Sequence, residues 1–308
     1  MKRRLLIMFL LGCLLPFAVQ AQHGTFRFAQ ITDIHFSPNN PNPTEDLLRS
    51  VAQINAIDSI DFVLVTGDIT EEGDRTTMLK VKETLDLLKA KYYVILGNHE
   101  TKWSDSGCTA FGEIFGGERF EFEHKGILFL GFNSGPLMRM AYGHVVPQDI
   151  RWMTEEMDKF GKDKPVILVT HYPLLDGDVD NWYEVTDAVR PYNIRLFIGG
   201  HYHRNRDLRY DGIPGILMRS NLRDKDGKPG YGIYDITKDS ILVYTQRIGE
   251  PKKQWAAFSL TQPYYDRNGK AEKYPDFSVN TEYPNVKEQW VVLSLIHISE
   301  PTRLGMIS

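Results

Sequence analysis

Five short motifs carry side chains with nitrogen and oxygen donors, and each motif directly follows an apolar run. The motifs are Asp33-Ile34-His35, Gly67-Asp68, Gly97-Asn98-His99-Glu100, His171 and Gly200-His201-Tyr202-His203. Imidazole and carboxylate groups are common ligands of divalent metal ions, whereas a thiolate site would require cysteines. The sequence therefore predicts that these motifs supply donors for two divalent metal ions, with Mn, Fe and Zn as candidates.

Such a pair of ions would perform hydrolysis without a protein nucleophile. Metal ions held about 3.5–4 Å apart trap a water between them, lower its pKa toward neutrality and stabilise an in-line displacement at phosphorus. His201 and His203 are two positions apart, which would place them on opposite faces of a regular strand. We therefore expect both to lie where the backbone turns, with Gly199-Gly200 favouring the turn.

The elements that position these donors are read from the intervening sequence. Short runs rich in β-branched, leucine and aromatic residues, typical of buried strands, cover residues 26–31, 62–66, 92–96, 166–170 and 195–198. Helical spacing of apolar residues covers 44–57, 77–89 and 148–160. Alternating strands and helices predict a layered α/β fold, whose ligand site gathers at the carboxyl ends of the strands. Later runs at 215–220, 231–236 and 240–248 predict an antiparallel finish, with a hairpin at Lys238-Asp239.

The five motifs, in this order, resemble the calcineurin-like metallophosphoesterase family over residues 26–248. The resemblance implies a four-layer αββα sandwich with mixed sheets and a dinuclear site. It implies that Asp33, His35, Asp68 and His203 hold one metal, and that Asp68, Asn98, His171 and His201 hold the second. It also implies that His99 donates a proton to the leaving group. The purple acid phosphatase branch is excluded, because His35 stands where that branch has glycine and residues 69–72 lack its tyrosine ligand.

Several assignments stay open at this point. Each motif alone could be a turn or a helix cap, and it is their joint occurrence that favours function. Arg204 could bind a phosphate oxygen or simply begin the next strand. The substrate could be a diester, which the Asp-x-His and Gly-His-x-His motifs favour, or a monoester. A non-catalytic binding module with the same fold is a third alternative. Glu100 replaces the more frequent aspartate and could orient an imidazole.

The sequence patterns at the two ends of the chain indicate processing events and not parts of the fold. Residues 1–21 have the basic start, apolar core and small-residue end of a secretory signal peptide, so we expect an exported, periplasmic or secreted protein. Lipoprotein anchoring at Cys13 is the less favoured alternative. The metallophosphoesterase domain is expected over 22–249 and an extended tail over 250–293, which could lead to a missing second domain. Residues 294–308 include a run that resembles a translated sequencing adapter, and we expect it to be an artefact.

Composition narrows the class of partner. The net charge is −4, and removing the three basic residues of the signal leaves about −7, without a basic stripe. A long nucleic acid is therefore not expected as a partner, and a small phosphorylated substrate is. No stable membrane span is expected after processing. Cys108 alone remains after cleavage, so the mature chain has no internal disulfide. The oligomeric state is not predicted.

Overall fold

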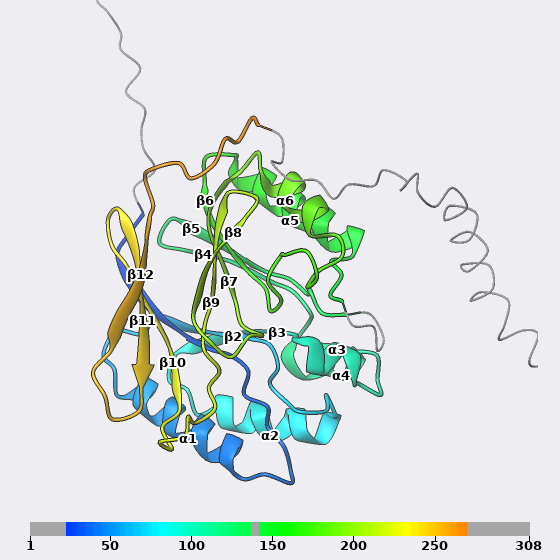
Figure 1. The fold of residues 1–308 in the computed structure, drawn as a ribbon, viewed down its shortest axis with the longest axis vertical. Helices are drawn as coiled ribbons and strands as arrows, with labels where there is room; N and C mark the ends of the chain where they lie inside the picture. The colour runs from blue at the N-terminus through cyan, green and yellow to red at the C-terminus, as the bar shows by residue number, and fades with distance from the viewer. Residues whose placement is uncertain (1–22, 137–141, 270–308) are drawn as a thin grey trace, which may run out of the picture. The chain divides into compact units, whose positions relative to one another are not determined.

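The computed structural model describes residues 23–136 and 142–269, which form two six-stranded mixed sheets (Figure 1). The first sheet has the order β12-β11-β10-β1-β2-β3, and the second has the order β4-β5-β6-β7-β9-β8. The strands of the first sheet are β1 (Phe26–Ile31), β2 (Phe62–Thr66), β3 (Lys91–Ile95), β10 (Gly230–Ile236), β11 (Ser240–Arg247) and β12 (Lys253–Ser259). Those of the second are β4 (Phe120–His124), β5 (Ile127–Gly131), β6 (Pro165–Val169), β7 (Asn193–Gly199), β8 (Arg206–Tyr210) and β9 (Ile213–Leu217).

Within the described ranges, six helices lie between the strands along the chain. They are α1 (Asn42–Asn55), α2 (Arg75–Leu85), α3 (Asn98–Lys102), α4 (Thr109–Phe115), α5 (Pro147–Phe160) and α6 (Trp182–Val189). Local chemistry explains several boundaries. Prolines open α1 and α5, where the missing N–H costs nothing. The Asp74 side chain caps α2 by accepting from the backbone N–H of Thr77. In the described residues, no helix is long and apolar enough to cross a membrane.

Three hydrophobic clusters divide the fold into four layers. Phe28 and Leu64 of the first sheet pack with Phe129 and Ile167 of the second, so one core lies between the sheets. A second core joins the other face of the first sheet to α1, α2 and α4, and a third joins the other face of the second sheet to α5 and α6. The αββα sandwich is therefore confirmed, and the central strands are buried on both faces, as β2 shows.

Parallel pairing brings five strand ends to the same edge of the sandwich. β1, β2 and β3 are parallel neighbours, and so are β5, β6 and β7. The predicted antiparallel finish is also found, because β10 pairs antiparallel with both β1 and β11. The motifs after β1, β2, β3, β6 and β7 therefore meet where the two sheets face each other.

The predicted tail begins too early. Lys253–Ser259 form β12, which pairs antiparallel with β11, although the sequence analysis placed residues from 250 onward in an extended tail. The hydroxyl of Tyr265 also accepts a hydrogen bond from the backbone N–H of Ile194, at 2.9 Å. β12 is an edge strand with mostly partial burial, so its sequence lacks the apolar alternation of a core strand. The predicted signal peptide, residues 270–293 of the predicted tail and residues 294–308 lie outside the described residues.

Candidate metal centre

All seven predicted ligands converge at the carboxyl ends of the parallel strands. Asp33 and His35 follow β1, Asp68 follows β2, and Asn98 begins α3 after β3. From the second sheet, His171 follows β6, and His201 and His203 follow β7. In each of two groups of side chains, the donor atoms lie within 4.8 Å of one another. One group is Asp33, His35 and His203, and the other is Asp68, His171 and His201.

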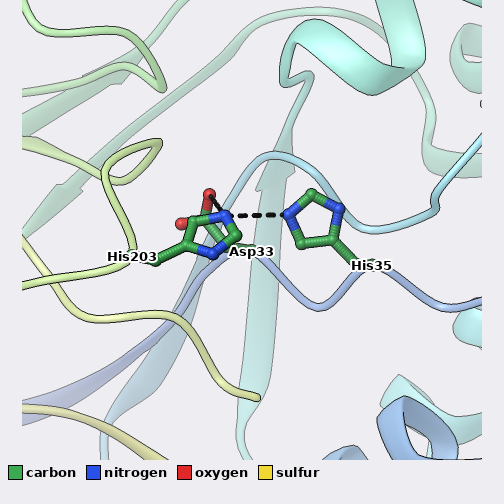
Figure 2. A group of neighbouring side chains, drawn as sticks. All are labelled: Asp33, His35 and His203. Carbon is green, nitrogen blue, oxygen red and sulfur yellow. Dashed lines mark hydrogen bonds and ion pairs between the residues drawn. The ribbon is translucent and has the colours of Figure 1, made fainter.

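The first group faces inward around a small space (Figure 2). The Nε2 atoms of His35 and His203 are 3.0 Å apart, and His203 Nε2 is 3.3 Å from Asp33 Oδ1. Three donor atoms at these separations are typical of ligands that share one ion with bonds of about 2.1 Å. The chain order separates His35 from His203 by 168 positions, so only the packing of the two sheets joins them.

The second group is linked to the first through Asp68. His171 Nε2 lies 3.1 Å from Asp68 Oδ2 and 3.1 Å from Asn98 Oδ1. The same Oδ2 atom of Asp68 is 3.8 Å from His35 Nε2 in the first group. A carboxylate oxygen near nitrogen ligands of both groups is suited to a shared position between two ions.

Five of the seven residues have left-handed backbone conformations. Their φ angles are 51° for Asp33, 49° for His35, 49° for Asp68, 75° for His201 and 56° for His203. For residues other than glycine this region costs about 1 kcal/mol or more, and such strain is concentrated at functional sites. The prediction that His201 and His203 lie at a backbone turn is confirmed. The turn lets side chains two positions apart reach the same space.

Glycine serves here mainly to allow close backbone approach. A Cβ on Gly97 would lie 2.2 Å from the backbone nitrogen of Asp68, and one on Gly200 would lie 2.0 Å from Thr32 Oγ1. The expected role of Gly199-Gly200 was conformational freedom, but neither residue has a positive φ. Position 200 therefore needs glycine because Thr32 and Asp33 leave no room for a Cβ there.

Backbone groups orient several of the donors. Both carboxylate oxygens of Asp33 accept from the backbone N–H of His201, at 3.0 and 3.1 Å. His171 Nδ1 is 2.7 Å from the carbonyl oxygen of Thr66, so it donates there and leaves Nε2 facing Asp68. From β1, the Gln30 side chain donates to the carbonyl of Gly199 at 2.9 Å and joins the two sheets beneath the site.

The charges of the described residues fit a cation at this position. Asp33 and Asp68 are 0% and 2% exposed, and no lysine or arginine among the described residues pairs with either carboxylate. Buried carboxylates without cationic partners are strongly destabilising unless an ion or a proton compensates them. The donor set, two aspartates with an amide and four imidazoles, therefore fits two divalent metal ions.

Burial and neighbouring charges shift the pKa values of the ligand residues in different directions. Although burial opposes it, the charge of Asp68 raises the pKa of His171 to about 9. Burial also opposes ionisation of Asp68, yet His171 holds the pKa of that carboxyl below its ordinary value. Burial lowers the pKa of His201 to about 3, and the nearby charge of His171 acts in the same direction. Metal binding must therefore displace protons from this cluster.

Glu71 was not recognised as a site residue in the sequence, and Glu100 was given another role. Glu71 Oε2 lies 3.1 Å from His35 Nδ1, and the Glu71 carbonyl oxygen is 2.5 Å from His99 Nδ1. Glu100 does not orient an imidazole. Its buried carboxylate accepts from the backbone N–H groups of Thr70 and Gly97, both at 2.9 Å, and so ties together the loops after β2 and β3. The contacts of Glu71 with the histidines do not follow from local sequence spacing, whereas the contact of Glu100 with the Gly97 N–H has the three-residue spacing of a capping box.

Arg204 is not brought to the cavity beside these ligands. The cavity has a volume of about 670 Å³ and is lined by His35, Asp68, Asn98, His99, His201 and His203 together with residues of neighbouring loops. Arg204 is exposed and is absent from this lining, because the chain leaves the site after His203 toward the edge strand β8. The described cationic residue that does line the cavity is Arg223.

Comparison with known proteins identifies the class to which this fold and site belong. The sequence profile of calcineurin-like phosphoesterases matches residues 26–205, more than half of the chain. The chain therefore belongs to the calcineurin-like phosphoesterase family and is a metal-dependent phosphoric ester hydrolase. The family is dinuclear, and the two groups of candidate ligands are present here.

Several relatives with assigned names are phosphodiesterases, and another is a serine/threonine-protein phosphatase of Mus musculus. The chain is 26% identical over 279 residues to a "Probable glycerophosphodiester phosphodiesterase" of Arcobacter nitrofigilis, covering 78% of this chain and 97% of that protein. It is 23% identical over 212 residues to a 3′,5′-cyclic-nucleotide phosphodiesterase of Nostoc, covering 62% and 78%. An uncharacterized protein of Bacillus subtilis, YvnB, is 26% identical over 80% of this chain, but the match spans only 20% of that protein.

A solved structure supports the fold independently. A dimetal phosphatase from Danio rerio superposes with a TM-score of 0.59 at 14% identity, covering 74% of this chain and 98% of that one. At this identity the likeness concerns the fold alone.

Proposed function

We propose that this protein is an exported phosphodiesterase that hydrolyses small phosphodiesters. The observation that carries the proposal is the convergence of seven nitrogen and oxygen donors, five of which line an open cavity of about 670 Å³. Relatives named for glycerophosphodiester and cyclic-nucleotide substrates support a diester rather than a monoester. The cavity volume is within the range of small-molecule sites and suits a phosphate bearing an organic group.

In this proposal Asp33, His35, Asp68 and His203 would hold one ion, and Asp68, Asn98, His171 and His201 would hold the other. When bound, the ions supply Lewis-acid catalysis and an activated water as the nucleophile. The contribution of the protein is to fix the positions of the donor atoms. Backbone contacts at Asp33 and His171 orient the ligands before substrate arrives.

His99 is placed to act on the leaving group. It lines the cavity, its ring lies 4.6 Å from that of His35, and its Nδ1 is held by the Glu71 carbonyl. With Nδ1–H committed to that carbonyl, a proton on Nε2 can pass to the departing alcohol oxygen. The position of His99 at the start of α3 is fixed by its backbone N–H, which donates to Asp68 Oδ1 at 2.9 Å.

Export is proposed from residues 1–21, whose pattern is that of a secretory signal. Expression of the full chain in a Gram-negative host, followed by fractionation and mass spectrometry of the mature protein, tests this part. A new amino terminus at Gln22 supports a soluble exported form, and a lipid-modified Cys13 supports an anchored one. An unprocessed cytoplasmic protein would overturn the export proposal.

Metal content and substrate choice test the catalytic part. The purified protein should contain close to two transition-metal ions per chain and hydrolyse bis-p-nitrophenyl phosphate faster than p-nitrophenyl phosphate in Mn, Zn or Fe. Preference for the monoester would support phosphomonoesterase activity instead. A metal-loaded protein that hydrolyses neither ester would favour a non-catalytic binding module.

A further inference from the structure

The cavity continues beyond the metal ligands into a region that the proposed reaction does not use. The residues that line this region are here termed the outer wall: Ser37, Asn40, Asn42, Pro43, Asp46, Leu222 and Arg223. A substrate whose phosphate sits at the metal ligands must place its organic group in this direction, since both sets of residues line the same cavity. The chemistry of the outer wall therefore bears on the identity of that group.

Two short loops and the start of α1 form the outer wall, and both loops are tied to the metal centre. The first loop continues directly from His35, with Phe36 bridged to Thr70 and Ser37 bridged to Asn40. The second follows β9, and the backbone N–H of Asn221 donates to the carbonyl of Thr32 at 2.8 Å. These contacts fix the position of the outer wall relative to the metal ligands that follow β1.

Arg223 is rigid, and its charge is already compensated. Its backbone N–H and its Nε both donate to the fully buried carboxylate of Asp46, each at 2.8 Å. Its Nη2 donates to Glu45, also at 2.8 Å. Two carboxylates therefore neutralise this guanidinium, which makes it a poor site for a second anionic group. Its Nη1 has no hydrogen-bond partner among the described residues and remains available as a donor.

The other polar groups of the outer wall are uncharged and short. Asn40 Oδ1 accepts from the backbone N–H of Asn42 at 3.1 Å, which leaves the Asn40 amide nitrogen free to donate into the cavity. The Ser37 hydroxyl oxygen accepts from the backbone N–H of Asn39 at 3.3 Å and keeps its own hydrogen. Amides and hydroxyls of this kind complement alcohol hydroxyl groups, which both donate and accept.

Aromatic surface is absent from the same region. Apart from the histidines of the metal centre, no aromatic side chain is among the described residues that line the cavity, and Pro43 and Leu222 supply its apolar surface. Proteins commonly hold a nucleobase by stacking it on an aromatic ring. The outer wall offers hydrogen bonds in place of such a platform.

We propose that the outer wall binds an uncharged polyhydroxy alcohol group, such as glycerol, esterified to the phosphate, and that it disfavours nucleotides. This inference rests on the proposed phosphodiesterase function. Asn40, Asn42 and Arg223 are the specificity-determining residues, because their donors meet the hydroxyl oxygens of the alcohol. Two such hydrogen bonds should give roughly a tenfold preference, which corresponds to about 1.4 kcal/mol.

A matched pair of substrates tests the inference. Glyceryl p-nitrophenyl phosphate and propyl p-nitrophenyl phosphate have the same leaving group and differ by two hydroxyls. The wild type should show kcat/KM about tenfold higher for the glyceryl ester, mainly through KM, and should hydrolyse 3′,5′-cyclic AMP less efficiently than the glyceryl ester. The double variant Asn40→Ala/Asn42→Ala should lose most of the preference, mainly through a higher KM for the glyceryl ester. The control is Asn39→Ala, because Asn39 is an exposed neighbour outside the cavity lining.

The outcomes separate the inference from the function on which it rests. Equal kcat/KM for the two esters, a higher value for cyclic AMP, or an equal loss on both esters in the double variant would overturn the role of the outer wall. Failure to hydrolyse even the propyl ester would overturn the phosphodiesterase function. In that case calorimetry decides the role of the wall. Tighter binding of glycerol 3-phosphate than of propyl phosphate supports it, and equal binding overturns it.

Discussion

At the residue scale, the two nitrogens of each imidazole have different tasks. His99 uses Nδ1 to contact the Glu71 carbonyl, so its Nε2 is the nitrogen left for the substrate. Replacing His99 with alanine should leave the metal content unchanged and slow hydrolysis by about 10²–10⁴-fold for poor leaving groups. The effect should be small for p-nitrophenolate, which departs without a proton. Rates for a series of aryl and alkyl esters measure this dependence, and equal slowing across the series would contradict the acid role.

Glu71 is the residue whose importance is least visible in the sequence. Its carboxylate lies 3.1 Å from His35 Nδ1, within ion-pair distance but without a hydrogen bond, while His35 Nε2 faces Asp68 and His203. Glu71→Gln removes the charge and keeps the main-chain contact with His99. We expect metal affinity to fall by about 10–100-fold, as for other residues that orient metal ligands. Competition with a chelator of known affinity measures it, with the exposed neighbour Glu72→Gln as control. Unchanged affinity in Glu71→Gln would show that the contact is incidental.

At the scale of elements, the loops after β2 and β3 are packed too closely for a side chain at Gly97. A Cβ there would lie 2.2 Å from the Asp68 nitrogen, so Gly97→Ala must displace one of the metal-ligand loops. We expect a loss of about 2 kcal/mol or more in the free energy of unfolding, together with reduced metal content. Gly112→Ala in α4 is the matched control, because nothing lies within 4 Å of its Cβ and a helical alanine is favoured by about 0.5–1 kcal/mol. Urea denaturation compares the two, and equal stability would refute the packing argument.

A cluster of charged side chains also links the strands of the first sheet to one another. Asp235 of β10 pairs with Arg27 of β1, and its Oδ2 lies 2.6 Å from Lys252 Nζ, just before β12. Although burial opposes it, hydrogen bonds from Arg27 and Lys252 hold the pKa of Asp235 below its ordinary value. The resulting stability is present above the unfolded pKa of about 3.9 and is lost as pH falls through the lower folded pKa.

Asp235→Asn should therefore destabilise the protein by about 1 kcal/mol at neutral pH, a value discounted for partial solvent screening. The difference from the wild type should shrink below about pH 4, where the wild-type carboxylate also becomes protonated. Chemical denaturation from pH 3 to pH 7 measures both values. A difference that does not change with pH would assign the effect to lost packing rather than charge.

At the scale of the whole molecule, bound metal ions should stabilise the fold, a contribution that disulfides do not make. Cys108, the only described cysteine, is unpaired, and the site joins loops from both sheets. Removing the metals should lower Tm by about 10 °C, since a ligand at a thousand times its Kd stabilises by about 4 kcal/mol and domains of this size shift by about 2–4 °C per kcal/mol. Calorimetry with and without chelator tests this. Asp68→Asn, which should weaken both metal sites, should show little response to the chelator, and a full response would contradict the shared position.

Much of the fold and the site followed from local pattern. β1 and β2 were predicted with their observed bounds, and α5 within one residue, because apolar runs and proline starts are local signals. The seven donors were found because each directly follows such a run. β12 was missed because an exposed edge strand has little apolar alternation. Arg204 was given a substrate role on the strength of its nearness to His203 in the chain, and nearness in the chain does not place a side chain in a cavity.

The sequence alone determined the donor types, the strand ends that carry them and hence the class of chemistry, because hydrophobic periodicity and metal-ligand chemistry are properties of short segments. Only the tertiary structure decided that His35 meets His203, that Glu71 serves two histidines, and that Asn40 and Arg223 share the cavity with the metal ligands. These contacts depend on how two sheets pack and on left-handed turns held by long-range hydrogen bonds. Residues far apart in the chain determine both.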